Sequence, residues 1–233
     1  MVIEANRLID TGPPDDNADA PTSADVRKML LVARPGLRFG EVMTGMITMG
    51  CTDPSEGYQN DAAIAMRLNV RVEVPNLPAF LKDPSHRGRW AASGSVPVLG
   101  GEVEGTGVGD FRLFQRAIRE GKGIREMVYD SVISVGGQTF YLRGRKFVEP
   151  SPPWRVWPAT TTLYIQLFPL AGERGLPVGA GILRLTLLAF ARQLLSMRII
   201  GKIKWYDKPR HLFSFYRFFV TSLVNTYIKG RRW

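Results

Sequence analysis

Apolar and polar residues alternate along much of the chain between residues 27 and 187. The stretch "IAMRLNVRVEV" (64–74) shows this most clearly, because every second residue is apolar. An antiparallel strand with one face against a core and the other toward water has this period of two. The stretch therefore predicts a half-buried strand, whose inward face includes Ile64, Met66, Leu68, Val70 and Val72.

Other stretches repeat the pattern at the spacing of a meander. Residues 125–147, "REMVYDSVISVGGQTFYLRGRKF", predict a hairpin that turns at Gly136-Gly137, a pair suited to a primed turn. The stretches "GRWAASGSVPV" and "GVGDFRLFQR" predict another pair of strands, separated by the glycine-rich "LGGEVEGTG". Further strands are expected at 37–49, 160–168 and 180–187.

About eight or nine short strands without interleaved helices favour a mainly β fold over an α/β fold. We expect an antiparallel meander β-barrel, lipocalin- or calycin-like in general shape, with C-terminal amphipathic helices. A barrel of roughly eight strands either encloses one small ligand or fills itself with side chains. The pattern leaves both alternatives open.

Three parts follow from these patterns. Residues 1–26 are proline-rich and lack periodicity, which predicts an extended or disordered acidic arm. Residues 27–187 are the expected barrel domain. From 188 to 233 the period becomes helical, and in the last segment one helical stripe is apolar: Leu212, Tyr216, Phe219, Leu223 and Tyr227, with Phe213, Val220 and Val224 beside it.

The formal net charge of +10 is concentrated in the tail. Residues 192–233 hold ten Lys/Arg against Asp207 alone, a net charge of +9, whereas residues 1–25 hold one Arg against six Asp/Glu. Basic side chains interleaved with aromatic ones on an amphipathic helix suit an anionic membrane interface. The alternatives are simple docking on the barrel and, less favoured because no motif is present, nucleic acid. The candidate membrane- or partner-binding residues are Lys202, Lys204, Trp205, Lys208, Arg210, Phe213, Arg217, Lys229, Arg231 and Arg232.

The stretch "WRVWPATTTLYIQLF" (154–168) places three threonines before a β-prone run. Internal threonines lack the free amine that activates an N-terminal threonine nucleophile, so we interpret the stretch as a strand of the barrel wall. Its candidates for lining a ligand, or for plugging one barrel end, are Leu163, Tyr164, Ile165, Leu167, Trp154 and Trp157.

Catalytic and metal-binding patterns are weak. His86 and His211 are the only histidines and Cys51 is the only cysteine, so neither a Ser-His-Asp triad nor a Cys/His zinc site is indicated. "EGTGVGD" leads into a strand pattern rather than the helix that a nucleotide loop requires. We expect no catalytic residues, metal or cofactor. A single cysteine and the absence of a visible secretory signal fit a cytoplasmic protein, peripheral on the inner face of the membrane.

Six motifs resemble a segment of large bacterial proteins that carry a GMC-type, cholesterol-oxidase-like flavin oxidoreductase, often fused to an α/β-hydrolase. The motifs are "FGEVMTGMITMG", "DPSEGY", "RVEVPNLPAFLKDPSH", "PVLGGEVEGTGVGDFRLF", "VWPATTTLYIQL" and "GAGILRLTLLAFARQLLSMR", within about residues 37 to 225. The resemblance implies a stand-alone copy of the accessory, non-flavin domain, associated by context with lipid or sterol chemistry. Redox activity is not implied, because the chain lacks the flavin-binding G-x-G-x-x-G and the hydrolase's nucleophile turn.

Three functional hypotheses follow. The preferred one is a non-enzymatic accessory or binding protein at the membrane surface, with an apolar ligand such as a lipid, sterol or isoprenoid in the barrel. The alternative is a peripheral structural subunit of a membrane-embedded complex, which grips its neighbours through the acidic arm and the basic tail. The third is a lipid-modifying enzyme, which needs a polar cluster inside the barrel, such as Tyr164 with Thr160 or Thr162 and Arg143 or Arg145.

Overall fold

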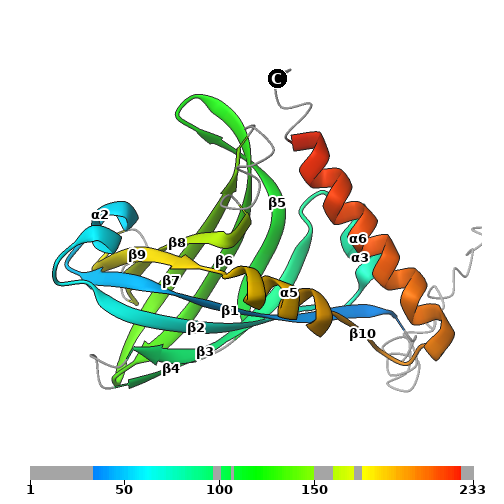
Figure 1. Ribbon diagram of the computed structural model, residues 1–233, viewed down its shortest axis with the longest axis horizontal. Coiled ribbons are helices and arrows are strands. Elements are labelled where there is room, and N and C mark those ends of the chain that lie inside the picture. The colour runs from blue at the N-terminus through cyan, green and yellow to red at the C-terminus, as the bar shows by residue number, and fades with distance from the viewer. Residues whose placement is uncertain (1–33, 97–100, 106–107, 150–159, 171–174, 227–233) are drawn as a thin grey trace, which may run out of the picture. The chain divides into compact units, whose positions relative to one another are not determined.

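The computed structural model describes residues 34–96, 101–105, 108–149, 160–170 and 175–226. Within these ranges ten antiparallel strands form one sheet that curls round on itself (Figure 1). The strands are β1 (Gly36–Met49), β2 (Ile64–Val74), β3 (Arg87–Val96), β4 (Gly101–Gly105), β5 (Gly109–Arg119), β6 (Lys122–Val135), β7 (Gln138–Val148), β8 (Thr162–Pro169), β9 (Gly179–Arg184) and β10 (Arg198–Ile200).

The barrel closes because β1 pairs along both of its edges. One edge pairs with β2, and the other pairs with β9 over Thr44–Met49 and with β10 over Gly36–Arg38. β4 and β5 share one position in the wall, since each pairs with both β3 and β6. The prediction of a mainly β, antiparallel meander barrel with a C-terminal helix is therefore confirmed, and the closed wall has eight strand positions in the described part of the chain.

Alternation along the strands builds this wall as expected. Met66, Leu68, Val70 and Val72 of β2 are buried, and the residues between them are less so. β6 and β7 form the predicted hairpin, in which Val135 pairs with Gln138. The two residues between them, Gly136 and Gly137, have φ of 56° and 79°, the left-handed conformation that a two-residue primed turn requires.

Local structure differs from the prediction at three places. The glycine-rich stretch expected to be a connection contains the strand β4. Two short helices, α2 (Pro54–Gln59) and α3 (Leu77–Lys82), interrupt the meander, although no interleaved helix was expected. Each begins after a capping side chain, Asp53 or Asn76, with proline in its first turn. Six residues are too few to display a helical period, so the sequence pattern misses them.

The C-terminal segment is part of the barrel rather than a separate tail. It contains α5 (Leu187–Ser196), β10, the 3₁₀ helix η3 (Trp205–Asp207) and α6 (Lys208–Val224). The helical pattern predicted from residue 188 onward is interrupted after Ser196, where Arg198–Ile200 form β10 and pair with β1. The expected boundary at 187/188 therefore does not divide two independent units.

The amphipathic stripe of α6 packs against one end of the barrel (Figure 1). Phe215 is buried, and its ring centroid lies 6.4 Å from that of Phe39 on β1. Phe219 lies 5.3 Å from Phe114 of β5, and Phe218 lies 6.3 Å from Phe80 of α3, measured between ring centroids. These aromatic contacts hold α6 over the barrel end.

Candidate functional site

The predicted inward residues of β2 and β8 lie in the barrel core. Met66, Leu68, Val70 and Val72 are almost completely buried, and so are Leu163, Ile165 and Leu167. Ile64 is partly buried against the same hydrophobic cluster. These side chains therefore pack against one another in the interior.

The other three lining candidates are Tyr164, Trp154 and Trp157. We expected Tyr164 to line the interior, but its ring lies on the opposite face of β8, with its centroid 5.3 Å from that of Phe147. Alternation causes this, because the neighbouring Leu163 and Ile165 point inward. Trp154 and Trp157 lie outside the described residues.

The polar cluster that the enzyme hypothesis needs does not form from the residues named for it. Arg143 and Arg145 alternate with the inward residues of β7 and lie on its opposite face. Arg145 forms ion pairs there with Asp130 and Glu126, and the guanidinium carbon of Arg143 lies 4.7 Å from the ring centroid of Phe168. These groups stabilise the outer surface of the wall.

A different polar cluster lies inside the barrel, near the end that α5 and α6 cover. Glu41 of β1 and Lys146 of β7 both point inward, and Glu41 Oε2 lies 2.6 Å from Lys146 Nζ. The side chains are 4% and 2% exposed. Burial removes both charges from bulk solvent, so each is stabilised by the other.

Tyr129 of β6 and Gln193 of α5 complete this cluster. The Tyr129 hydroxyl donates to Glu41 Oε1 at 3.2 Å, and Lys146 Nζ lies 5.1 Å from the Tyr129 ring centroid. Burial, with a smaller contribution from the Glu41 charge and its hydrogen bond, raises the pKa of Tyr129 well above its usual range. The phenol is therefore a neutral donor near pH 7 rather than a base.

Gln193 brings one further acceptor into the cluster. Its Nε2 donates to Glu41 Oε1 at 2.8 Å. Because a carboxylate oxygen paired in this way only accepts, the contact fixes the orientation of the amide. Gln193 Oε1 is then buried without a hydrogen-bond donor among the described residues. A buried oxygen without a hydrogen bond costs free energy. Gln193 Oε1 is therefore the atom of the cluster that can accept a hydrogen bond from a bound group.

A cavity of about 40 Å³ adjoins the four polar groups; we call it the chamber. Its walls are mostly apolar. They come from the strands (Phe39, Phe111, Leu113, Met127), from α5 (Phe190, Leu194), from the segment after it (Met197) and from α6 (Phe215, Tyr216, Phe219), and Thr160 also borders it. The chamber has room for a water-sized group. A larger body enters only if a covering helix moves.

The helix α5 fills a gap in the barrel wall. β1 pairs with β10 up to Arg38 and with β9 from Thr44, so residues 39–43 have no strand partner along that edge within the described ranges. α5 lies across this gap (Figure 1), where the Gly40 backbone N–H donates to Ser196 Oγ at 3.1 Å. The same placement lets Gln193 reach Glu41. Tyr216 of α6 donates to the Leu194 carbonyl at 3.1 Å, so the two covering helices contact each other.

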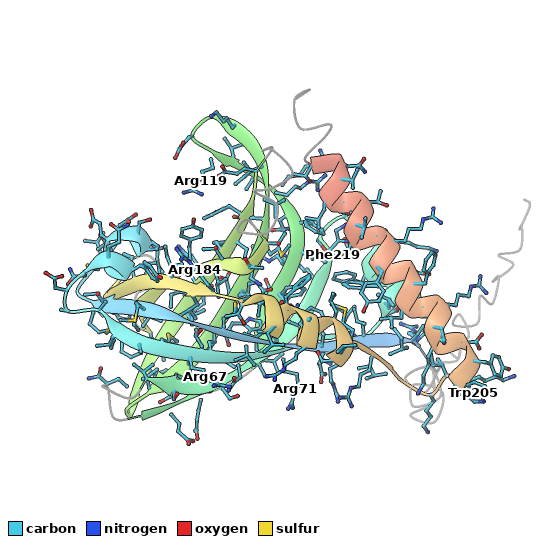
Figure 2. All side chains as sticks on the ribbon, viewed as in Figure 1. Arg67, Arg71, Arg119, Arg184, Trp205 and Phe219 are labelled. Carbon is cyan, nitrogen blue, oxygen red and sulfur yellow. The ribbon has the colours of Figure 1, made fainter. Side chains whose placement is uncertain are left out.

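The outer face of η3 and α6 is apolar, aromatic and basic together. Figure 2 shows Phe219 on the side of α6 that faces the barrel and Trp205 at the far end, turned outward. Trp205 and Tyr206 of η3 are exposed, and so are Phe213, Val220 and Val224 of α6. We call these five residues the outer face. The predicted cations Lys202, Lys204, Lys208, Arg210 and Arg217 are all exposed beside it, while Lys229, Arg231 and Arg232 lie outside the described residues.

Other sequence candidates have structural roles. His86, in the turn before β3, contacts the Phe80 carbonyl through Nδ1 at 2.6 Å, and its ring lies against Phe218 of α6. In the described ranges no group of three or more His, Cys, Asp or Glu side chains could hold a metal ion. No helix there is long and apolar enough to cross a membrane.

Sequence reasoning missed the four residues of the internal cluster. A usable signal was present for two of them, because Glu41 lies in phase with the buried Phe39 and Met43, and Lys146 in phase with Leu142 and Val148. A charge at an inward position of a strand predicts a buried partner. Gln193 carries no comparable signal, since its role depends on where α5 docks.

The fold and the internal cluster define a closed antiparallel barrel with a helical cover over a buried polar group. Comparison with models of known families, with curated proteins and with solved structures gave no match.

Proposed function

We propose that the protein is a non-enzymatic binding protein that attaches to an anionic membrane surface through its outer face. It holds an apolar ligand with the polar head in the chamber and the apolar body in the space that opens when α6 moves. The observation that supports this best is the two-sided character of α6. One side of the helix covers the chamber, and the other exposes aromatic and apolar side chains among cations. Membrane contact and access to the chamber then involve the same helix.

The outer face has the chemistry of an interfacial helix. Phe213 is 67% exposed and Trp205 80% exposed, and burial of such a side chain contributes about 1.5–3 kcal/mol. Each basic residue close to an anionic surface adds about 1 kcal/mol. Aromatic rings at headgroup depth, with lysine and arginine above them, match this arrangement.

Cosedimentation with vesicles tests the proposed attachment to a membrane. We expect the wild type to bind vesicles of phosphatidylserine and phosphatidylcholine, and the variant Phe213→Ser/Val220→Ser to bind at least about tenfold more weakly, because two apolar contacts are lost. The control is Ile118→Ser/Leu176→Ser, which removes two exposed apolar residues outside α6, one near the end of β5 and one before β9. Equal binding by both double variants would refute attachment through the outer face.

The chamber favours a ligand with a hydroxyl head and an apolar body. A hydroxyl group can donate to Gln193 Oε1, and the aromatic walls suit a hydrocarbon. A sterol or a long-chain or isoprenoid alcohol has this chemistry. The resemblance to an accessory domain associated with lipid and sterol chemistry points to the same class.

The proposed ligand binding is tested by native purification of the protein, organic extraction and mass spectrometry. We expect a hydroxylated apolar compound from the wild type, and its loss from Gln193→Met. Gln166→Met is the control, because Gln166 lies on the side of β8 that faces away from the barrel core. There its Nε2 donates to the Thr52 carbonyl. Absence of any such compound would refute the proposed ligand binding. Co-migration with a large complex without an extractable compound would favour the alternative of a peripheral subunit.

A further inference from the structure

A second, larger hollow lies on the outside of the barrel, next to α5. This groove has a volume of about 660 Å³ and is bordered by β1, β2, β3 and α5. Small strand residues flank Arg71 and leave space above the sheet: Gly40 pairs with Arg71 on one side and Ala91 on the other. The neighbouring row is Val42, Asn69 and Ser93. α5 forms a raised wall along one edge.

Three arginines face this groove. Arg67 and Arg71 project from the outer face of β2, on the same side of the strand in Figure 2, and Arg192 comes from α5. All three are exposed, and none forms an ion pair within the described part of the chain. Arg67 and Arg71 are about 13 Å apart along the strand, with Asn69 between them. Both side chains are long enough to converge over Asn69.

The rest of the lining is complementary to an anion. Hydroxyl groups of Thr44, Ser93 and Thr186 also line the groove. Glu41 is the one acidic residue that borders the groove among the described residues, and its carboxylate is engaged inside the barrel with Lys146. The described lining of the groove therefore carries a net positive charge.

Shape and composition narrow the class of anion. The lining contains no aromatic side chain in the described ranges, so a nucleobase has no platform to stack on. Guanidinium groups bind phosphate oxygens in bidentate fashion, and three of them match a dianionic group. Leu188, exposed at the groove rim on α5, offers an apolar contact beside the phosphate.

We propose that the groove binds a phosphate monoester, presented by a soluble molecule or by a lipid headgroup, through Arg67, Arg71 and Arg192. This site is on the other side of α5 from the chamber and away from the outer face of α6, and it does not depend on the function proposed for either. Glu41 of β1 and Gln193 of α5 border both the chamber and the groove, so β1 and α5 together separate the two.

Two binding measurements on the full chain test the proposal. The first is calorimetric titration with glycerol phosphate, a soluble monoester. The second is cosedimentation with vesicles that contain either phosphatidic acid, a monoester lipid, or phosphatidylglycerol, a diester lipid, at matched surface charge. Each is carried out on the wild type, on Arg67→Gln/Arg71→Gln and on Arg87→Gln/Arg89→Gln. The last variant removes the same charge from exposed positions of β3 outside the groove.

The proposal predicts that the groove variant loses at least about tenfold in affinity for the monoester, and that the control changes less than about twofold. Binding of glycerol phosphate with this response identifies a soluble source. A preference for phosphatidic acid that only the groove variant loses, without binding of glycerol phosphate, identifies a lipid source. The proposal is overturned if the groove variant lowers neither the affinity for glycerol phosphate nor the preference for phosphatidic acid more than the control does. If the double variant unfolds, two single variants replace it: Arg192→Gln on the exposed side of α5, and Ser93→Asp, which adds a negative charge. Each is expected to lower the affinity for the monoester.

Discussion

Glu41 and Lys146 form a buried ion pair in which each charge depends on the other. Removal of one member of such a buried pair leaves the other charge uncompensated, at a cost of about 3–5 kcal/mol. We expect Glu41→Gln and Lys146→Met each to lower the free energy of unfolding by this amount. The double variant should lose much less than the sum, because it leaves no buried charge.

Urea unfolding of the wild type, both single variants and the double variant measures this coupling. A loss in the double variant equal to the sum of the two single losses would mean that the charges do not depend on each other.

Tyr129 makes stability depend on pH in the alkaline range. Its pKa is raised in the folded protein, whereas in the unfolded chain it titrates near pH 10. Below that value both states hold the proton. Above it the unfolded chain releases a proton that the folded protein keeps, so the stability contributed by Tyr129 is lost as pH rises, by up to about 1.4 kcal/mol per pH unit.

Tyr129→Phe removes this dependence. At pH 9 we expect the variant to be less stable by about 1 kcal/mol, because one hydrogen bond to Glu41 is lost. At pH 11 the difference should shrink or reverse, since only the wild type has lost the contribution of Tyr129. A constant difference in the free energy of unfolding between the two pH values would contradict the account.

At the residue scale, the sequence allowed prediction of side chains whose environment follows from alternation alone. Met66, Leu68 and Leu163 are buried as predicted. The prediction for Tyr164 was wrong. It placed this side chain in the interior with Leu163 and Ile165, although alternation puts it on the opposite face of β8. The partner of Glu41 could not be predicted, because Lys146 is 105 residues away along the chain and only the closed barrel brings them together.

Among the elements, the seam between β1 and β9 is where the barrel closes, and glycine makes the closure possible. A Cβ added at Gly45 of β1 would lie 2.0 Å from the Ile182 carbonyl oxygen of β9, whereas one added at Gly40 of the same strand meets nothing closer than 3.6 Å. A backbone atom cannot move aside as a flexible side chain can. The close approach of these two strands therefore requires glycine at position 45.

We expect Gly45→Ala to lower the free energy of unfolding by at least about 1–3 kcal/mol through overpacking. Gly40→Ala, on the same strand, should stay within about 0.5 kcal/mol of the wild type. Chemical denaturation of the two variants measures the difference. Similar losses at both positions would show that the seam tolerates a side chain.

Elements with a long, regular pattern were predicted well from the sequence, and elements defined by docking were not. The strand 64–74 and the hairpin at Gly136-Gly137 match the structure because alternation and turn chemistry are local. The strand β10 has three residues, and α5 bridges an interrupted pairing edge. Both depend on where a distant part of β1 lies, so no local pattern encodes them.

At the scale of the whole molecule, positive charge and apolar exposure coincide on η3 and α6. Residues 202–226 hold five Lys/Arg against Asp207 alone, a net charge of +4. The five residues of the outer face lie within the same segment. Electrostatic attraction to an anionic surface decays within about 8 Å at physiological ionic strength, so the proposed membrane attachment requires η3 and α6 to face that surface.

Spin-label accessibility tests this orientation most directly. Single cysteines at positions 213, 220 and 176, in a Cys51→Ser background, carry a nitroxide. Leu176 precedes β9 near the end of β1 that pairs Met49 with Gly179, whereas α6 contacts β10 at the other end of β1. On addition of anionic vesicles, the account predicts more collisions with oxygen and fewer with a water-soluble nickel chelate at 213 and 220, and no change at 176. Unchanged accessibility at 213 and 220, or an equal change at 176, would contradict attachment through α6.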